Sequence, residues 1–274
     1  FKLFHVCVFL INAVNKVQSY KKSQKPQDKN NSPFSFLNSP FFYIFASFGN
    51  DMKKYVIIVA GGSGKRMGTD VPKQFLPLAG KPVLMHTIDA FYRYDSQVNV
   101  LLVLPLAHME YWCELCNQYA YNKPVILVEG GSERFYSVQN AMQKVPCDAL
   151  VAVHDGVRPL VDSQTIERAF VSAEKNGSAV PVIPETDSLR KLTQEGSKSV
   201  DRSAYVRVQT PQVFRSDLIK EAYNQVYKTT FTDDASVFES LGNAVSLTVG
   251  NVSNIKITTP VDLKWAETLL HESV

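Results

Sequence analysis

A glycine-rich turn with two embedded cations is the segment of this sequence best suited to chemistry. The run VIIVAGGSGKRMG is an apolar strand that passes directly into Gly61, Gly62 and Gly64, with Lys65 and Arg66 among them. Glycines let the backbone approach phosphate oxygens, and successive N–H groups can form an anion-binding nest. The spacing is neither G-x-G-x-x-G nor G-x-x-x-x-G-K-[ST], which excludes a dinucleotide fingerprint and a P-loop. The turn therefore predicts a phosphate cradle of another kind.

The turn is followed by PKQFLPLAGKP and by six further motifs in a fixed order. These are EGGSERFYSV (129–138), HDGVRP (154–159), VDR (200–202), QTPQVF (209–214), TDDAS (232–236) and NIKITTP (254–260). Together they resemble the nucleotidyltransferases that make CDP-activated sugar alcohols, above all the 2-C-methyl-D-erythritol 4-phosphate cytidylyltransferase family. The resemblance covers residues 53 to 271. It implies transfer of a cytidylyl group from CTP to 2-C-methyl-D-erythritol 4-phosphate, with release of pyrophosphate, in isoprenoid precursor biosynthesis.

The resemblance gives catalytic roles to four cations. Arg66 and Lys73 match the family's two transition-state stabilisers, whereas Arg202 and Lys256 match positions near the acceptor. Attack of a phosphate oxygen on the α-phosphorus of CTP creates a crowded anionic transition state, which cations stabilise. Mg²⁺ is the implied cofactor. We expect the CTP phosphates to hold it, and we predict no set of protein metal ligands.

The resemblance also divides the binding residues between two halves of one site. The CTP half comprises Ala60, Gly61, Gly62, Gly64, Lys65, Gly131, Ser137 and Asp155, and the acceptor half comprises Asp155, Arg158, Ser188, Arg202 and Lys256. Ser188 stands where the family commonly has Thr, so the hydroxyl is kept. We expect a structural role for His154, because a phosphate dianion needs no general base to become a nucleophile.

The elements that position these residues alternate from Met52 onward, as in a parallel sheet covered by helices. The expected strands are 55–59, 98–104, 125–128, 150–153, 179–183 and 245–249, and the expected helices are 83–92, 108–119, 135–144, 163–175, 217–227, 234–241 and 261–271. The fold class is α/β, a Rossmann-like, mostly parallel twisted sheet with helices on both faces. Asp155 follows an expected strand directly, and such carboxyl ends are where open α/β sheets bind ligands.

A polar segment at about 185–208 interrupts the alternation and predicts a protruding β-hairpin arm that turns at Glu195-Gly196. Because a two-stranded hairpin is only marginally stable alone, we expect it to pack against another element or subunit. The resemblance implies a homodimer in which this arm reaches the neighbouring acceptor site. Arg202 and Ser188 would then act in trans.

Charge and composition separate residues 1–51 from the rest of the chain. The formal net charge of the 274 residues is +3, but the first 51 contribute +4, which leaves −1 for residues 52–274. A near-neutral body has no electrostatic footprint for nucleic acid. The first 51 residues also hold nine of the 16 Phe and show no periodicity. We interpret them as a disordered or upstream translated leader, with translation starting at Met52.

A signal peptide at Leu3 to Val14 is the rival interpretation of the leader, although His5 and Asn12 interrupt its apolar run. No apolar run in the sequence has the roughly 18 residues of a membrane span. We therefore expect a cytoplasmic protein without a membrane partner.

Cys113 and Cys116 form a C-x-x-C pair, but a zinc site needs a second ligand pair, so we expect core packing.

Two other functions remain open at this point. Ribitol-5-phosphate cytidylyltransferase shares the glycine-rich turn and the PKQ and TPQ motifs, although Asp187 to Arg190 in the arm favour the methylerythritol enzymes. A nucleotide-binding regulator without turnover belongs to a different class. The presence of Arg66, Lys73 and Lys256 argues against it.

Overall fold

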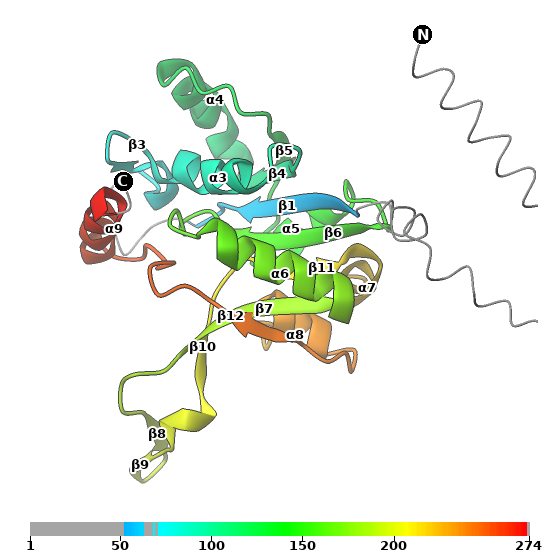
Figure 1. Cartoon of the computed structure of the whole chain (residues 1–274), viewed down its shortest axis with the longest axis vertical. Coiled ribbons are helices and arrows are strands. Elements are labelled where there is room, and N and C mark those ends of the chain that lie inside the picture. The colour runs from blue at the N-terminus through cyan, green and yellow to red at the C-terminus, as the bar shows by residue number, and fades with distance from the viewer. Residues whose placement is uncertain (1–51, 63–67, 69–70, 273–274) are drawn as a thin grey trace, which may run out of the picture. The chain divides into compact units, whose positions relative to one another are not determined.

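The computed structural model describes residues 52–62, 68 and 71–272, and these belong to one compact unit, Met52–Val274. The leader and three predicted site residues, Gly64, Lys65 and Arg66, lie outside the described residues. The described part of the chain folds around one large sheet (Figure 1).

The sheet has the strand order β10-β7-β11-β6-β1-β4-β5, with β12 beside β7. Its strands are β1 (Lys53–Val59), β4 (Asn99–Leu104), β5 (Ile126–Glu129), β6 (Ala149–Asp155), β7 (Ser178–Pro184), β10 (Val206–Val208), β11 (Gln212–Arg215) and β12 (Leu247–Val249). Strands β6, β1, β4 and β5 pair in parallel, whereas β11 is antiparallel to both of its neighbours. The sheet is therefore mixed and mostly parallel, as the sequence predicts.

Helices cover both faces of the sheet because the central strands are apolar on both sides. In β1, Val56 and Ile58 belong to one buried cluster and Ile57 to the other, which is the alternation that a strand imposes. The first cluster includes side chains of α3 (Val83–Tyr94), α4 (Met109–Gln118) and α6 (Ser163–Asn176), and the second includes those of α5 (Arg134–Met142), α7 (Ser216–Ala222) and α8 (Asp234–Glu239).

Local signals set both ends of helix α6. The Asp162 side chain accepts a hydrogen bond from the Thr165 N–H at 2.6 Å, and this caps the helix N-terminus. Gly177 ends the helix with a φ of 86°, a conformation that glycine adopts at no steric cost. The capped helix then leads directly into β7.

A third, smaller cluster holds the C-terminal helix α9 (Pro260–Glu272) against the region that follows the glycine-rich turn. It contains Leu78, Val83, Val157, Ile257 and Ala266. Leu78 lies in a short hairpin formed by β2 (Pro77–Leu78) and β3 (Lys81–Pro82). This packing places residues 254–257 beside the carboxyl end of β6. None of the helices within the described ranges is long and apolar enough to cross a bilayer.

The predicted arm is a hairpin only in part. Strands β8 (Arg190–Thr193) and β9 (Gly196–Ser199) pair antiparallel away from the main sheet, and the short 3-10 helix η5 (Arg202–Ala204) follows them (Figure 1). Strand β10 instead pairs with β7 and extends the main sheet. The arm therefore leaves the sheet after β7 and rejoins it at β10.

Candidate active site

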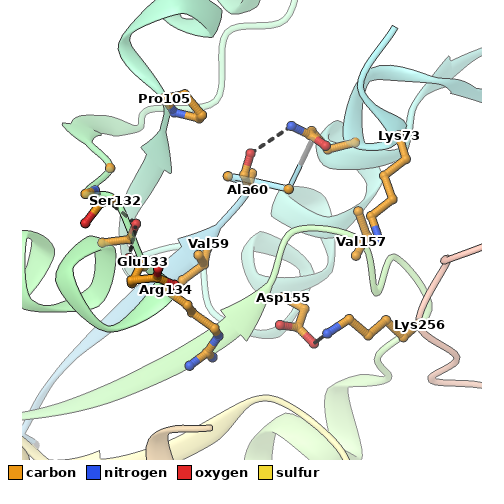
Figure 2. A pocket seen from close by; sticks show the side chains of 16 residues that line it. Val59, Ala60, Lys73, Pro105, Ser132, Glu133, Arg134, Asp155, Val157 and Lys256 are labelled. Atoms are coloured by element: carbon orange, nitrogen blue, oxygen red, sulfur yellow. Dashed lines mark hydrogen bonds and ion pairs between the residues drawn. The ribbon is translucent and has the colours of Figure 1, made fainter. Parts of the chain in front are cut away.

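A cavity of about 360 Å³ lies at the carboxyl ends of the central parallel strands. The chain runs from β1 outward to β4 and β5 and then returns to β6 on the other side of β1, so the strand order reverses there. The lining residues are Val59, Ala60, Gly61, Gly62, Lys73, Gln74, Pro105, Gly130, Gly131, Ser132, Glu133, Arg134, Ser137, Asp155, Val157 and Lys256 (Figure 2). The cavity thus occupies the crevice where such sheets bind ligands.

Asp155, the last residue of β6, is held between cations. Its Oδ2 atom lies 3.1 Å from Nζ of Lys256 and 3.1 Å from Nε of Arg158. In Figure 2, Asp155 lies between the side chains of Lys256 and Arg134. Burial raises the pKa of Asp155, but Lys256, Arg134 and Arg158 outweigh it and hold that pKa well below its usual range. Asp155 is therefore an ionised acceptor at neutral pH.

His154 is fully buried and holds the polypeptide around Asp155 in place. The Arg158 carbonyl lies 3.1 Å from Nε2 of His154, so that nitrogen carries the proton and donates. Nδ1 then accepts from the Thr210 hydroxyl at 3.0 Å. Burial lowers the pKa of His154 to about 4, so the ring is neutral. These contacts agree with the predicted structural role.

Lys73 and Gln74 lie in the 3-10 helix η3 (Lys73–Phe75), which forms another wall of the cavity. Nε2 of the buried Gln74 donates to the Ala60 carbonyl at 2.8 Å. This bond connects η3 to the end of β1, where the glycine-rich turn begins. Lys73 extends along the same wall (Figure 2).

A tight loop between β5 and α5 forms the wall that contains Gly131, one of the residues that the resemblance assigns to the CTP half of the site. The Ser137 hydroxyl accepts from the Gly131 N–H at 3.1 Å and donates to the Glu133 carbonyl at 3.0 Å. A Cβ atom at Gly131 would lie 2.4 Å from Cβ of Tyr136, so only glycine fits. The loop therefore contributes the backbone of Gly130 and Gly131 together with the side chains of Ser132 and Glu133 to the cavity, and Ser137 of α5 adds a hydroxyl.

Arg134 is a lining residue that the sequence reasoning missed. Its Nη2 donates to Oδ2 of Asp234 at 2.6 Å, and the Tyr223 hydroxyl donates to Oδ1 of the same carboxylate at 2.7 Å. Burial is the largest single influence on the pKa of Arg134 and lowers it, but Asp234, Tyr223 and Asp155 together outweigh burial and raise that pKa. The motifs EGGSERFYSV and TDDAS contain these two charges, and their opposite signs were the available signal for a pair.

The structure brings most of the described site residues together. Ala60, Gly61, Gly62, Lys73, Gly131, Ser137, Asp155 and Lys256 line the cavity, and Arg158 contacts it through Asp155. Ser188 and Arg202 lie in the arm and are not among the lining residues of this chain. Nη1 of Arg202 donates to the Thr186 carbonyl, which ties the two ends of the arm together.

The described residues contain no cluster of three or more His, Cys, Asp or Glu side chains that could hold a metal ion. The carboxylates that line the cavity are Asp155 and Glu133. Mg²⁺ commonly keeps several waters and uses only one or two carboxylates plus substrate phosphates. This donor set fits Mg²⁺ that arrives with a polyphosphate. Cys113 and Cys116 lie in α4 and are not among the residues that line the cavity. Cys116 is half-buried against the first cluster, and burial raises its pKa to about 11, which agrees with packing. Cys113 is exposed, so the expected core packing is wrong for this residue.

Fold and cavity together define a nucleotidyltransferase of the α/β class, with a glycine-rich strand end, a carboxylate at the neighbouring strand end and converging cations. The family model for IspD, 2-C-methyl-D-erythritol 4-phosphate cytidylyltransferase, matches residues 54–272. The chain belongs to this family.

Individual relatives agree with the family match. The chain is 51% identical over 219 residues to 2-C-methyl-D-erythritol 4-phosphate cytidylyltransferase of Phocaeicola vulgatus, which covers 80% of this chain and 100% of that protein. It is 53% identical over 221 residues to the protein of the same name from Porphyromonas gingivalis, covering 80% and 99%. The Thermus thermophilus crystal structure of that name superposes with a TM-score of 0.63 at 31% identity, covering 81% and 99%.

Proposed function

We propose that this chain transfers the cytidylyl group of CTP to 2-C-methyl-D-erythritol 4-phosphate. The products are 4-diphosphocytidyl-2-C-methyl-D-erythritol and pyrophosphate. The observation that carries the proposal is the convergence of Lys73, Arg134 and Lys256 on one cavity at the end of a parallel sheet, in a chain of this family. Ribitol-5-phosphate remains the alternative acceptor, although the relatives compared above are named for methylerythritol phosphate.

CTP occupies the side of the cavity nearest β1 and β5 in this proposal. The backbone of Ala60 to Gly62, Gly131 and the Ser137 side chain face the cytosine, and Ser137 Oγ, which already donates to the Glu133 carbonyl, is the acceptor offered to the base. A site built from such donors and acceptors rejects a base that lacks the matching group, because its own buried polar groups would stay unpaired. The ionised Asp155 accepts hydrogen bonds from the ribose hydroxyls.

The reaction needs positioned charge more than proton transfer. A phosphate oxygen of the acceptor forms a bond to the α-phosphorus of CTP, and the bond between that phosphorus and the α,β-bridging oxygen breaks, so pyrophosphate leaves with the electron pair. Lys73 and Lys256 stabilise the negative charge on the transferring group, together with Arg66 and Lys65 of the glycine-rich turn. The neutral His154 takes no proton in this scheme.

Mg²⁺ is the proposed cofactor, bound with the triphosphate of CTP. Asp155 is the carboxylate best placed to contact it or its waters, because it is ionised and lines the cavity. Mg²⁺ bound to phosphate oxygens neutralises charge and orients the leaving group.

The acceptor half of the site combines Asp155, Arg158 and Lys256 of one subunit with the arm of a second. In this proposal the partner subunit's Arg202 and the partner subunit's Ser188 bind the acceptor phosphate. The arm and its root expose the apolar side chains of Leu192, Tyr205, Val206 and Val208, which a partner chain would cover. The proposed assembly is a homodimer.

Pyrophosphate release tests the proposal. Purified protein is incubated with CTP, Mg²⁺ and either methylerythritol phosphate or ribitol 5-phosphate. We expect release with the first acceptor and little with the second. Pyrophosphate release with ribitol 5-phosphate alone would identify that compound as the acceptor. Binding of CTP without pyrophosphate release from either acceptor would support a nucleotide-binding regulator without turnover.

A mixed dimer tests the arm. Subunits carrying Arg202→Ala are combined with subunits carrying Lys73→Ala, each of which alone is expected to be nearly inactive. If the arm acts in trans, one site of the mixed dimer keeps both Lys73 and Arg202 and works. An arm that acts in cis gives no recovery.

The functional unit in this proposal is residues 52–274, with a cytoplasmic location. The family match begins at residue 54, two residues after Met52. N-terminal sequencing of the natural protein would show whether translation starts there.

A further inference from the structure

The motif QTPQVF contributes three buried polar side chains that the proposed reaction does not use. Gln209 and Thr210 lie between the arm strand β10 and strand β11, Gln212 is the first residue of β11, and each is at most 6% exposed. Buried polar groups need hydrogen-bond partners. The partners of these three lie in three different segments around the cavity, which makes this motif a junction between them.

Gln209 binds the loop that leads to Lys256. Its Nε2 donates to the Asn251 carbonyl at 2.7 Å, and its Oε1 accepts from the Asn251 N–H at 3.1 Å. A carbonyl oxygen can only accept and an N–H can only donate, so these two contacts fix the orientation of the amide. A Cβ atom at Gly250 would lie 2.5 Å from Oε1 of Gln209, so the loop packs directly against this side chain.

Asn254 passes this constraint on toward the acceptor half of the cavity. Its Nδ2 donates to the Thr210 carbonyl at 2.8 Å, and its own carbonyl accepts from Nη1 of Arg158 at 2.8 Å. The N–H of the buried Ile257 donates to the Val157 carbonyl at 2.9 Å. Lys256 therefore lies between two backbone positions that are both held.

Thr210 fixes the other side of the same half. Its hydroxyl accepts from the Asp155 N–H at 3.1 Å and donates to Nδ1 of His154. The segment that begins at the root of the arm thus holds both Asp155 and the loop of its partner Lys256.

Gln212 makes an equivalent pair of contacts to a different segment. Its Nε2 donates to Oδ2 of Asp233 at 2.8 Å, and its Oε1 accepts from the Ala235 N–H at 2.8 Å. These contacts hold the N-terminus of α8, which begins with Asp234, the partner of Arg134. Gln209 and Gln212 therefore match in residue type, in burial and in number of strong contacts, but hold opposite sides of the cavity.

We propose that Gln209 is a positioning residue for the acceptor half of the site. It acts through the loop at Gly250 to Asn254 and thereby sets where Lys256 and the Arg158 guanidinium lie. The inference rests on the proposed function, which places Lys256 and Arg158 at the acceptor. It also gives the root of the arm a direct mechanical connection to the residues that the arm is proposed to complete.

The test uses Gln209→Met and Gln212→Met in the full chain, because Met keeps the length of the side chain and removes its hydrogen bonds. We expect Gln209→Met to raise the KM for methylerythritol phosphate about tenfold, with the KM for CTP changed less than about twofold. Gln212→Met should lack this selectivity. Equal changes of both KM values in Gln209→Met, or the same acceptor-selective loss in Gln212→Met, would overturn the proposal.

A Lys256→Met background separates positioning from general loss of structure. Because Gln209 acts on both Lys256 and Arg158, Gln209→Met should cause a smaller further loss of acceptor binding in that background than in the unmodified chain, whereas fully additive losses contradict the proposal. Lys256→Met without any effect on kcat/KM for the acceptor would instead contradict the role that the proposed function gives to Lys256. If Gln209→Met does not fold, Gln209→Asn, which keeps the amide but shortens the side chain, replaces it. Gln209→Asn should also raise the KM for methylerythritol phosphate more than the KM for CTP, by a smaller factor than Gln209→Met. If Gln209→Asn shows no such selectivity, the proposal is also overturned.

Discussion

The Nζ atom of Lys256 lies 3.1 Å from Oδ2 of Asp155, so the loop before the C-terminal helix and the end of strand β6 meet in one ion pair. Lys256 is nearly half exposed, whereas Asp155 is largely buried among Lys256, Arg158 and Arg134. The carboxylate therefore holds the amino group at the edge of the cavity, where a substrate phosphate can also reach it.

Lys256→Met tests that arrangement. We expect kcat/KM for methylerythritol phosphate to fall about 100-fold to 1000-fold, because the substitution removes a charge placed to stabilise the transition state. The melting temperature should change little, because Lys256 is nearly half exposed and the buried Asp155 keeps Arg158 and Arg134 as compensating charges. Lys54→Met is the control: Lys54 lies the same 3.1 Å from Asp95, at the opposite end of β1. A similar loss of activity in both variants would contradict the role of Lys256.

The pKa of His154 predicts how stability depends on pH. The folded value is about 4 and the unfolded value 6.5, so between these values the unfolded chain binds a proton that the folded chain does not. The free energy of unfolding should therefore rise with pH across this window, by about 3 kcal/mol from this residue. This contribution of His154 to stability is fully present above pH 6.5 and is lost as the pH falls toward 4.

Urea unfolding at a series of pH values measures this slope. His154→Gln removes the titrating ring and should flatten the dependence between pH 4 and 6.5. Some slope should remain, because burial also lowers the pKa of His86. Asp155 adds slope of the same sign near pH 4, because the unfolded carboxyl begins to bind protons around its pKa of 3.8, so the slope above about pH 5 reports His154 most directly. An unchanged slope in His154→Gln would show that the imidazole is not neutral in the folded protein.

The central strands could be predicted from the sequence because their physics is local. Strands β1, β4 and β6 are apolar runs ended by Gly, Pro or polar residues, and their predicted positions are confirmed within two residues at either end. Strand β11 was missed. Its four residues include Gln212 and Arg215, and only pairing with β6 and β7 makes them a strand.

Other differences also arise from tertiary contacts. The helix predicted at 217–227 ends at Ala222, where the side chain of Tyr223 turns inward to Asp234. Within the site, the motifs indicated Lys73, Asp155 and Lys256. Arg134 was not predicted because its position depends on a partner distant in sequence. A single motif indicates which residues contact the substrates, but it does not show which buried charges from another motif pair with them.

Arg134→Met tests what the ion pair between Arg134 and Asp234 contributes to stability. Asp234 is fully buried, so loss of the guanidinium leaves a carboxylate that keeps its hydrogen bond from the Tyr223 hydroxyl but loses its ion pair. We expect a loss of about 3–5 kcal/mol in the free energy of unfolding, because an unpaired buried charge is costly. Arg215→Met removes an exposed partner of Asp217 and should cost at most about 1 kcal/mol. Asp234→Asn added to Arg134→Met should recover part of the loss, and no recovery would point to packing rather than charge.

Gly131 and Gly61 differ in the reason why a glycine is needed: we expect Gly131 to be required by the fold and Gly61 by the ligand. A Cβ atom at Gly131 would meet Cβ of Tyr136 at 2.4 Å, whereas nothing lies within 4 Å of one at Gly61. Gly131→Ala should therefore lower the melting temperature without nucleotide and also weaken CTP binding, because the loop must move away from Tyr136. Gly61→Ala should leave the melting temperature unchanged and weaken CTP binding alone, since the added methyl group occupies only space that the base and phosphates approach. Calorimetric titration with CTP and thermal unfolding without it measure both effects. If Gly61→Ala binds CTP normally, the nucleotide does not approach the backbone there, and the base side of the cavity lies closer to the Gly131 loop.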